Sequence, residues 1–133
     1  MKTHVLDASA LYRYLSGAPG AESVANLLKQ ARHADKNILM SVVNWGEVFY
    51  NLMRVAGRDR AQQAMAAIDG LPLTIVDADR TLTREAADIR ASYGLPYADS
   101  FAAAVAGRNG IVVTTDVKHF GLVPWLKTRD LRQ

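Results

Sequence analysis

Short apolar runs rich in β-branched residues alternate along the chain with longer segments in which apolar residues recur at helical spacing. The short runs lie at residues 4–6, 37–40, 73–76 and 111–114, and each is expected to form a buried strand. The apolar segment 122–126 is expected to supply an edge strand, although Pro124 restricts how it can pair. Residues 21–34 show helical spacing, with Val24, Leu27, Leu28 and Ala31 on one face. The alternation predicts an α/β fold.

Residues that commonly start or stop helices divide the rest of the chain. A short helix is expected to begin at Asp7 and to stop near Gly17, whereas Ser41 is expected to cap a helix that ends near Gly57. Further helices are predicted over residues 59–68, from a cap at Asp77 or Asp79 to residue 93, and over residues 97–106. These boundaries leave short connections, as expected for a single compact domain.

The length and composition fit one ordinary globular domain. Of the 133 residues, 50% are hydrophobic and 22% are charged, a balance that excludes disordered and fibrous chains. The sequence has no cysteine, so disulfides and thiolate catalysis are excluded. Asp7 follows only two apolar residues, unlike the core of a signal peptide, and no run approaches the ~20 apolar residues of a membrane span. We therefore expect a cytoplasmic protein.

A modest excess of basic residues would favour polyanions if the side chains shared one face. The chain has 16 lysines and arginines against 13 acidic residues, a formal charge of +3. The candidates for a common surface form three groups: Arg54, Arg58 and Arg60; Arg80, Arg84 and Arg90; and Lys127, Arg129 and Arg132. The alternative is that each side chain only solvates a helix or strand.

Four acidic residues occupy positions where an α/β fold could build a ligand site. Asp7 and Asp116 follow predicted strands, and ligands of open α/β sheets bind outside the carboxyl ends of the strands. Glu47 lies early in its predicted helix, and Asp99 lies in the first turn of another. Their separations are 47 − 7 = 40, 99 − 47 = 52 and 116 − 99 = 17 residues, so only tertiary folding could bring them together.

The neighbours of these acids are largely apolar, which makes an unpaired charge costly. Two like charges about 4 Å apart repel by roughly 4 kcal/mol at an effective dielectric constant of ~20, so four converging carboxylates require cations. Carboxylate oxygens suit Mg²⁺ or Mn²⁺. Such an ion lowers the pKa of a bound water and stabilises charge on a phosphodiester, so no protein nucleophile is needed.

Each acid also has a purely structural interpretation. Asp7 could cap the first helix, and Asp99 could be a favourable charge at a helix N-terminus. Glu47 could pair with an arginine, and Asp116 could be a turn residue. The occurrence of all four in these contexts favours a common site.

The segments around the acids also form an ordered set. They are Val-Leu-Asp-Ala-Ser, Ser-Val-Val-Asn-Trp-Gly-Glu-Val, Leu-Pro-Tyr-Ala-Asp-Ser-Phe-Ala-Ala-Ala and Val-Val-Thr-Thr-Asp-Val-Lys-His-Phe. In this order, and at this chain length, they resemble the successive motifs of PIN domains, specifically the VapC toxins of bacterial toxin-antitoxin pairs. The resemblance covers almost the whole chain.

The resemblance implies a fold, an activity and partners. The fold would be a central parallel sheet of four or five short strands flanked by helices. The activity would be cleavage of structured RNA, such as transfer or ribosomal RNA, at an acidic Mg²⁺ or Mn²⁺ site. The partners would be a second copy in a homodimer and a small VapB-like antitoxin that blocks the cleft, often by presenting an arginine to the carboxylates.

The resemblance also assigns roles to individual residues. Asp7, Glu47 and Asp99 would be the core catalytic and metal-binding acids. Asp116 would be the more variable fourth, because some family members carry asparagine there and aspartate at the position of His119. Ser9 and Thr114 match the positions of small hydroxyl residues near the site in this family. Without the resemblance, Ser9 would be an ordinary helix-start residue and Thr114 an ordinary strand residue.

Two other functions remain open from the sequence. In a metal-dependent phosphohydrolase or phosphatase, Asp7 would accept the phosphoryl group. Against this, position 9 is serine rather than a second acid, and Glu47 and Asp99 would have no role. A noncatalytic RNA-binding regulatory module would keep the fold and use its basic surface, but the intact set of acids argues against it.

Overall fold

Five parallel strands form one sheet in the computed structural model, which describes residues 2–33 and 36–132. The strands are β1 (Lys2–Leu6), β2 (Lys36–Ser41), β3 (Thr74–Val76), β4 (Ile111–Thr114) and β5 (Lys127–Asp130). Their order is β3-β2-β1-β4-β5, so the first strand lies at the centre. Because the strands are parallel, their carboxyl ends all lie along one edge of the sheet. The predicted α/β fold is confirmed.

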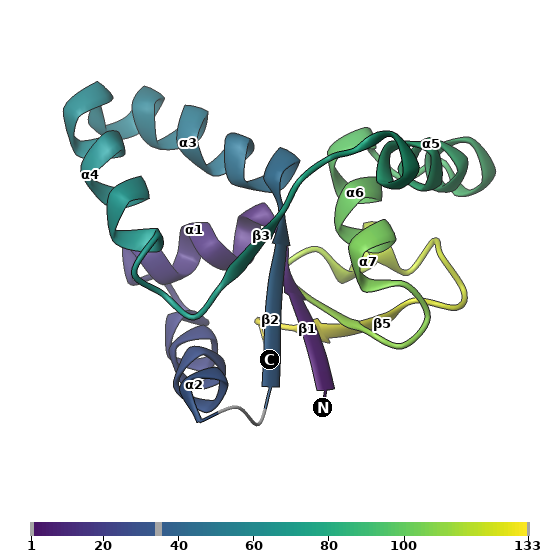
Figure 1. Cartoon of the computed structure of the whole chain (residues 1–133), viewed down its shortest axis with the longest axis horizontal. Helices are drawn as coiled ribbons and strands as arrows, with labels where there is room; N and C mark the ends of the chain where they lie inside the picture. Colours follow the sequence, from purple (N-terminus) through teal and green to yellow (C-terminus); the bar gives the residue numbers. More distant parts are fainter. Residues whose placement is uncertain (1, 34–35, 133) are drawn as a thin grey trace.

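Seven helices in the described part of the chain cover the two faces of this sheet (Figure 1). They are α1 (Ala8–Ser16), α2 (Ala21–Arg32), α3 (Val42–Ala56), α4 (Arg58–Ile68), α5 (Arg80–Tyr93), α6 (Tyr97–Ala106) and α7 (Val117–Phe120). Helices α1 to α4 lie on one side and α5 to α7 on the other. The predicted end of the second helix at Ala34 lies outside the described residues. None of the helices in the described ranges is long and apolar enough to cross a membrane.

Alternate residues of the central strands pack against opposite helical layers. Val5 of β1 and Val112 of β4 belong to the cluster under α5 and α6, whereas the next residues, Leu6 and Val113, belong to the cluster under α1 and α2. All four side chains are fully buried. Strands covered on both faces explain why the sequence shows continuous apolar runs here rather than alternation. Asp7, which follows Leu6, therefore emerges between the two layers.

Side chains and glycines fix the helix ends much as the sequence predicts. The Ser41 hydroxyl accepts a hydrogen bond of 3.0 Å from the Val43 amide at the start of α3. Of the two candidate caps for α5, it is Asp79 whose carboxylate accepts from the Leu82 amide. Gly94 ends that helix with φ of 73°, a left-handed conformation that favours glycine.

The predicted edge strand over residues 122–126 is wrong, because this segment folds as consecutive turns. The amides of Leu122, Val123 and Leu126 each donate to the carbonyl three residues earlier. Pro124 has no amide hydrogen for a strand ladder, and Val123 is buried beneath α6. The edge strand is instead β5, whose sequence Lys-Thr-Arg-Asp is polar and mostly exposed, so it lacks the apolar signal of the other strands.

Candidate active site

All four predicted acids line one pocket of about 420 Å³ at the carboxyl edge of the sheet. The acids are Asp7, Glu47, Asp99 and Asp116, and the pocket is further lined by α1 and α3 residues that include Tyr12 and Arg54. Its lining residues lie just after β1 and β4 and on α1, α3 and α6, and Figure 1 shows the upper, carboxyl ends of the central strands near α3 and α6. The fold therefore brings together residues that are up to 109 positions apart (116 − 7).

Asp7 is held rigidly at the end of β1, where its side chain is buried. One carboxylate oxygen, Oδ1, accepts from the Ser9 hydroxyl at 2.7 Å and from the Ala10 amide at 2.9 Å. The other, Oδ2, accepts a short hydrogen bond from the Thr114 hydroxyl. Burial nevertheless raises the pKa of Asp7, although these three hydrogen bonds oppose the increase. Asp7 is thus both the cap of α1 and a member of the pocket.

The same two hydroxyls connect Asp7 to the loop that carries Asp116. Ser9 Oγ accepts from the Thr115 amide at 3.0 Å, and Thr114 Oγ1 accepts from the Asp116 amide at 2.8 Å. Since each hydroxyl donates to Asp7 and accepts from this loop, it fixes one carboxylate relative to the other. Their position beside the carboxylates, expected from the family motifs, is what the structure shows.

Glu47 is oriented by an amide side chain that the sequence reading did not single out. Asn44 is fully buried, and its Nδ2 donates to Glu47 Oε1 at 2.9 Å and to the Ala98 carbonyl at 3.2 Å. Asn44 therefore links the acid of α3 to the first turn of α6, next to Asp99. The available signal was a polar residue one helical turn before Glu47 in an otherwise apolar run.

The acids carry little compensating positive charge. Within residues 2–33 and 36–132, no lysine or arginine forms a salt bridge with Asp7, Glu47, Asp99 or Asp116. Burial, followed by repulsion from Asp7, Glu47 and Asp116, raises the pKa of Asp99 to about 6. The suggested arginine partner of Glu47 is thus not found in that part of the chain. Crowded carboxylate oxygens without such partners fit a hard divalent cation.

His119 is a second residue beside the acids to which the separate residues of the sequence gave no role. Its Nδ1 lies 2.6 Å from Asp116 Oδ2 and 3.9 Å from Asp99 Oδ2. Asp116 also caps α7 by accepting from the His119 amide, so its structural role is that of a helix cap rather than of a turn residue. The sequence offered one indication of this contact, which is that His119 follows Asp116 by three residues, or about one helical turn.

The predicted basic groups do not form one surface. The first group lies on α3 and α4, the second on α5 across the sheet, and the third on and just after β5 at the edge (Figure 1). Arg90 donates to the carbonyls of Gly94 and Leu95, and Arg132 pairs with Asp130. Of the nine residues in these groups, only Arg54 lines the acidic pocket.

This protein is a parallel α/β domain in which four carboxylates converge at the carboxyl edge of the sheet. The sequence profile of the family described as the PIN domain matches residues 4–125. The chain therefore belongs to the PIN domain family. A comparison with curated protein sequences gave no match.

Several solved structures with a similar fold are VapBC complexes or are described as toxins. A chain of the DNA-bound VapBC complex of Salmonella typhimurium is 19% identical with a TM-score of 0.76, and the alignment covers 98% of this chain and 99% of that one. A chain of the promoter-bound VapBC2 complex of Rickettsia felis is 18% identical with a TM-score of 0.77, and the alignment covers 96% of this chain and 98% of that one. Mycobacterium tuberculosis VapC20, described as a Sarcin-Ricin loop cleaving toxin, is 17% identical with a TM-score of 0.60, and the alignment covers 84% of this chain and 87% of that one. At these identities the likeness is one of fold.

Proposed function

We propose that this protein is a metal-dependent endoribonuclease of the VapC type, which cleaves structured RNA such as transfer or ribosomal RNA. The observation that carries the proposal is the convergence of Asp7, Glu47, Asp99 and Asp116 in one pocket with no lysine or arginine salt bridge among the described residues. Membership of the PIN domain family and the fold shared with the VapC20 toxin support the same activity.

The proposed roles follow from how each side chain is held. Asp7, Glu47, Asp99 and Asp116 would hold Mg²⁺ or Mn²⁺, which would supply an acidified water and neutralise charge on the phosphodiester. Ser9 and Thr114 keep Asp7 in place, and Asn44 does the same for Glu47. Hydrolysis then joins the water oxygen to phosphorus and breaks the bond to the leaving oxygen, so no side chain forms a covalent bond.

The lining of the pocket also bears on the phosphatase alternative. Asp7 Oδ1 accepts two hydrogen bonds and Oδ2 accepts one, so Oδ2 keeps a lone pair that could serve either a metal ion or a phosphoryl group. Glu47 and Asp99 line the same pocket as Asp7, and a phosphoryl-accepting Asp7 would leave both of them without a role, which favours the metal-dependent nuclease.

Purified protein is expected to cut RNA internally in the presence of Mg²⁺ or Mn²⁺ and to lose that activity in EDTA. The reason is that the four converging carboxylates of the pocket require a cation, and the bound ion would lower the pKa of the attacking water. Sequencing of the fragment ends from total RNA would measure cleavage and identify the substrate together. Turnover of small phosphate esters with RNA left intact would contradict the proposal and favour the phosphatase.

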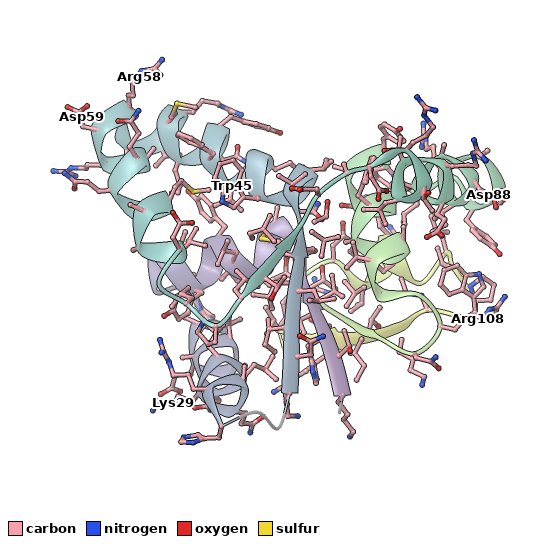
Figure 2. The ribbon with its side chains drawn as sticks, viewed as in Figure 1. Lys29, Trp45, Arg58, Asp59, Asp88 and Arg108 are labelled. Carbon is pink, nitrogen blue, oxygen red and sulfur yellow. The ribbon has the colours of Figure 1, made fainter. Side chains whose placement is uncertain are left out.

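Arg54→Ala is expected to raise the KM for RNA about tenfold and to change kcat little. Arg54 is exposed on α3 at the outer part of the acidic pocket, where it can contact a backbone phosphate away from the reacting bond. Losing one such contact costs roughly 1 to 1.5 kcal/mol of uniform binding. The control is Arg58→Ala, at the far tip of the α3 and α4 hairpin (Figure 2). Equal KM values for the two variants would contradict this role.

The proposal includes a VapB-like antitoxin, a second copy of the chain in a homodimer, and a location in the cytoplasm. Helix α3 exposes two large apolar side chains, Tyr50 at 48% and Val55 at 73%, and Val55 lines the pocket. Such exposed apolar surface next to an active site suits a covering partner, here a VapB-like antitoxin. The homodimer rests on the family resemblance. Co-purification with the product of a flanking short reading frame would test the antitoxin.

A further inference from the structure

The place of His119 is fixed by the turn that carries it. The ring of Phe120, the next residue, is fully buried in the cluster under α6. On the other side, the His119 amide donates to Asp116 Oδ1 at 3.2 Å. These two contacts anchor the short helix α7, and they direct the half-exposed imidazole toward Asp116 and Asp99 rather than into the core.

The distances around the ring match those between ligands of one ion. His119, Asp116 and Asp99 each offer an atom, and these three atoms lie within 4.8 Å of one another. In an octahedral site with bonds of about 2.1 Å, neighbouring ligands are about 3 Å apart and opposite ligands about 4.2 Å apart. The observed values of 2.6 Å to Asp116 and 3.9 Å to Asp99 differ from these by only a few tenths of an ångström.

We propose that His119 is a direct nitrogen ligand of the cation, together with Asp99 and Asp116, and that it makes the site prefer Mn²⁺ to Mg²⁺. This inference rests on the proposed metal-dependent function. Mg²⁺ favours oxygen ligands, whereas imidazole nitrogen binds transition metals more readily. The alternative is that Nδ1 keeps its proton and only donates a hydrogen bond to Asp116.

The chain has few other sources of an imidazole ligand. It contains three histidines. His4 is buried within β1 at 3% exposure, and His33 follows α2 next to the amino end of β2, at the opposite edge of the sheet from the pocket. A nitrogen signal from a bound ion that depends on the pocket acids therefore identifies His119.

Electron spin-echo spectroscopy of Mn²⁺ bound to the intact protein in a nitrogen-free buffer tests this inference without any activity measurement. The wild type is expected to show coupling to one imidazole nitrogen-14 nucleus. His119→Asp, which offers oxygen instead, should lose that coupling and lower the ratio of Mn²⁺ to Mg²⁺ affinity by about tenfold, while His33→Asn should change neither.

The outcomes separate this inference from the proposed function. Mn²⁺ binding that Asp99→Asn abolishes, but that shows no nitrogen coupling in the wild type, would overturn the ligand role of His119 and leave the acidic site standing. Mn²⁺ binding that is absent, or indifferent to Asp99→Asn, would overturn both. Because the decisive spectrum is that of the wild type, a poorly folded variant cannot mask the result.

Discussion

Asp99→Asn is expected to lower the rate of RNA cleavage by about a thousandfold or more while the protein stays folded. An ion at such a site contributes several kcal/mol to the transition state, and each 1.4 kcal/mol corresponds to about tenfold in rate. The amide has the shape of the carboxylate but only one oxygen acceptor and no charge. Among the described residues, Asp99 accepts no hydrogen bond from a side chain or backbone amide, so the fold does not depend on its charge.

Asp7→Asn should be equally inactive but is a less clean test. Its carboxylate accepts three hydrogen bonds, so an amide there would place a donor against the Thr114 or Ser9 hydroxyl and disturb α1. The matched control for both is Asp88→Asn, an exposed aspartate on the outer side of α5 (Figure 2). Cleavage is measured from initial rates on one identified RNA with Mn²⁺. Asp99→Asn activity within a few-fold of the Asp88→Asn control would remove Asp99 from the site.

The sequence predicts best where two independent signals agree. The helix α3 has helical periodicity, a serine cap at Ser41 and a terminal glycine at Gly57, and its predicted bounds match the structure. The buried strands β1 and β4 have apolar runs and a following acid, and both are found. The convergence of Asp7 and Asp116 could likewise be predicted, because parallel strands end along the same edge.

The elements that the sequence misjudges are those without a hydrophobic signature. Strand β5 is held by its ladder to β4 rather than by burial, so its polar residues resemble a loop. The apolar segment before it is buried, but as turns around Pro124. Apolar character therefore indicates burial more reliably than it indicates strand conformation.

The contacts of Asn44 and His119 in the site could not be predicted from the sequence, because each depends on two elements that meet only in the folded chain. The link from Asn44 to Glu47 and to the Ala98 carbonyl depends on α3 and α6 meeting, 54 positions apart in the sequence. His119 becomes significant only because Asp99, from another element, lies 3.9 Å from its ring. Such contacts are tertiary, and in the sequence they leave only a polar residue at an unremarkable position.

The stability ranking of wild type and Asp99→Asn is expected to reverse between EDTA and Mn²⁺. In EDTA at pH 8 the variant should be more stable by about 1 to 2 kcal/mol, once solvent screening of this partly exposed carboxylate is allowed for, or roughly 3 to 7 °C in Tm. The pKa of Asp99 in the folded chain, about 6, lies above its ordinary value of 3.8, so the folded state binds this proton more tightly than the unfolded chain. The ionised carboxylate therefore costs folding free energy, which the amide avoids.

The stability difference between the two proteins in EDTA is expected to depend on pH. The favourable protonation of Asp99 is fully present below about pH 4 and is lost as the pH rises through 6, so the advantage of the variant should appear over that interval and vanish at lower pH. Saturating Mn²⁺ at a hundredfold excess over Kd should then stabilise the wild type by about 2.7 kcal/mol, and the variant far less. Thermal unfolding of both proteins across pH, with and without Mn²⁺, measures all three effects. A variant that is no more stable than wild type in EDTA at pH 8 would show that the pocket tolerates its crowded charges without a cation, and the main electrostatic argument for a metal would be lost.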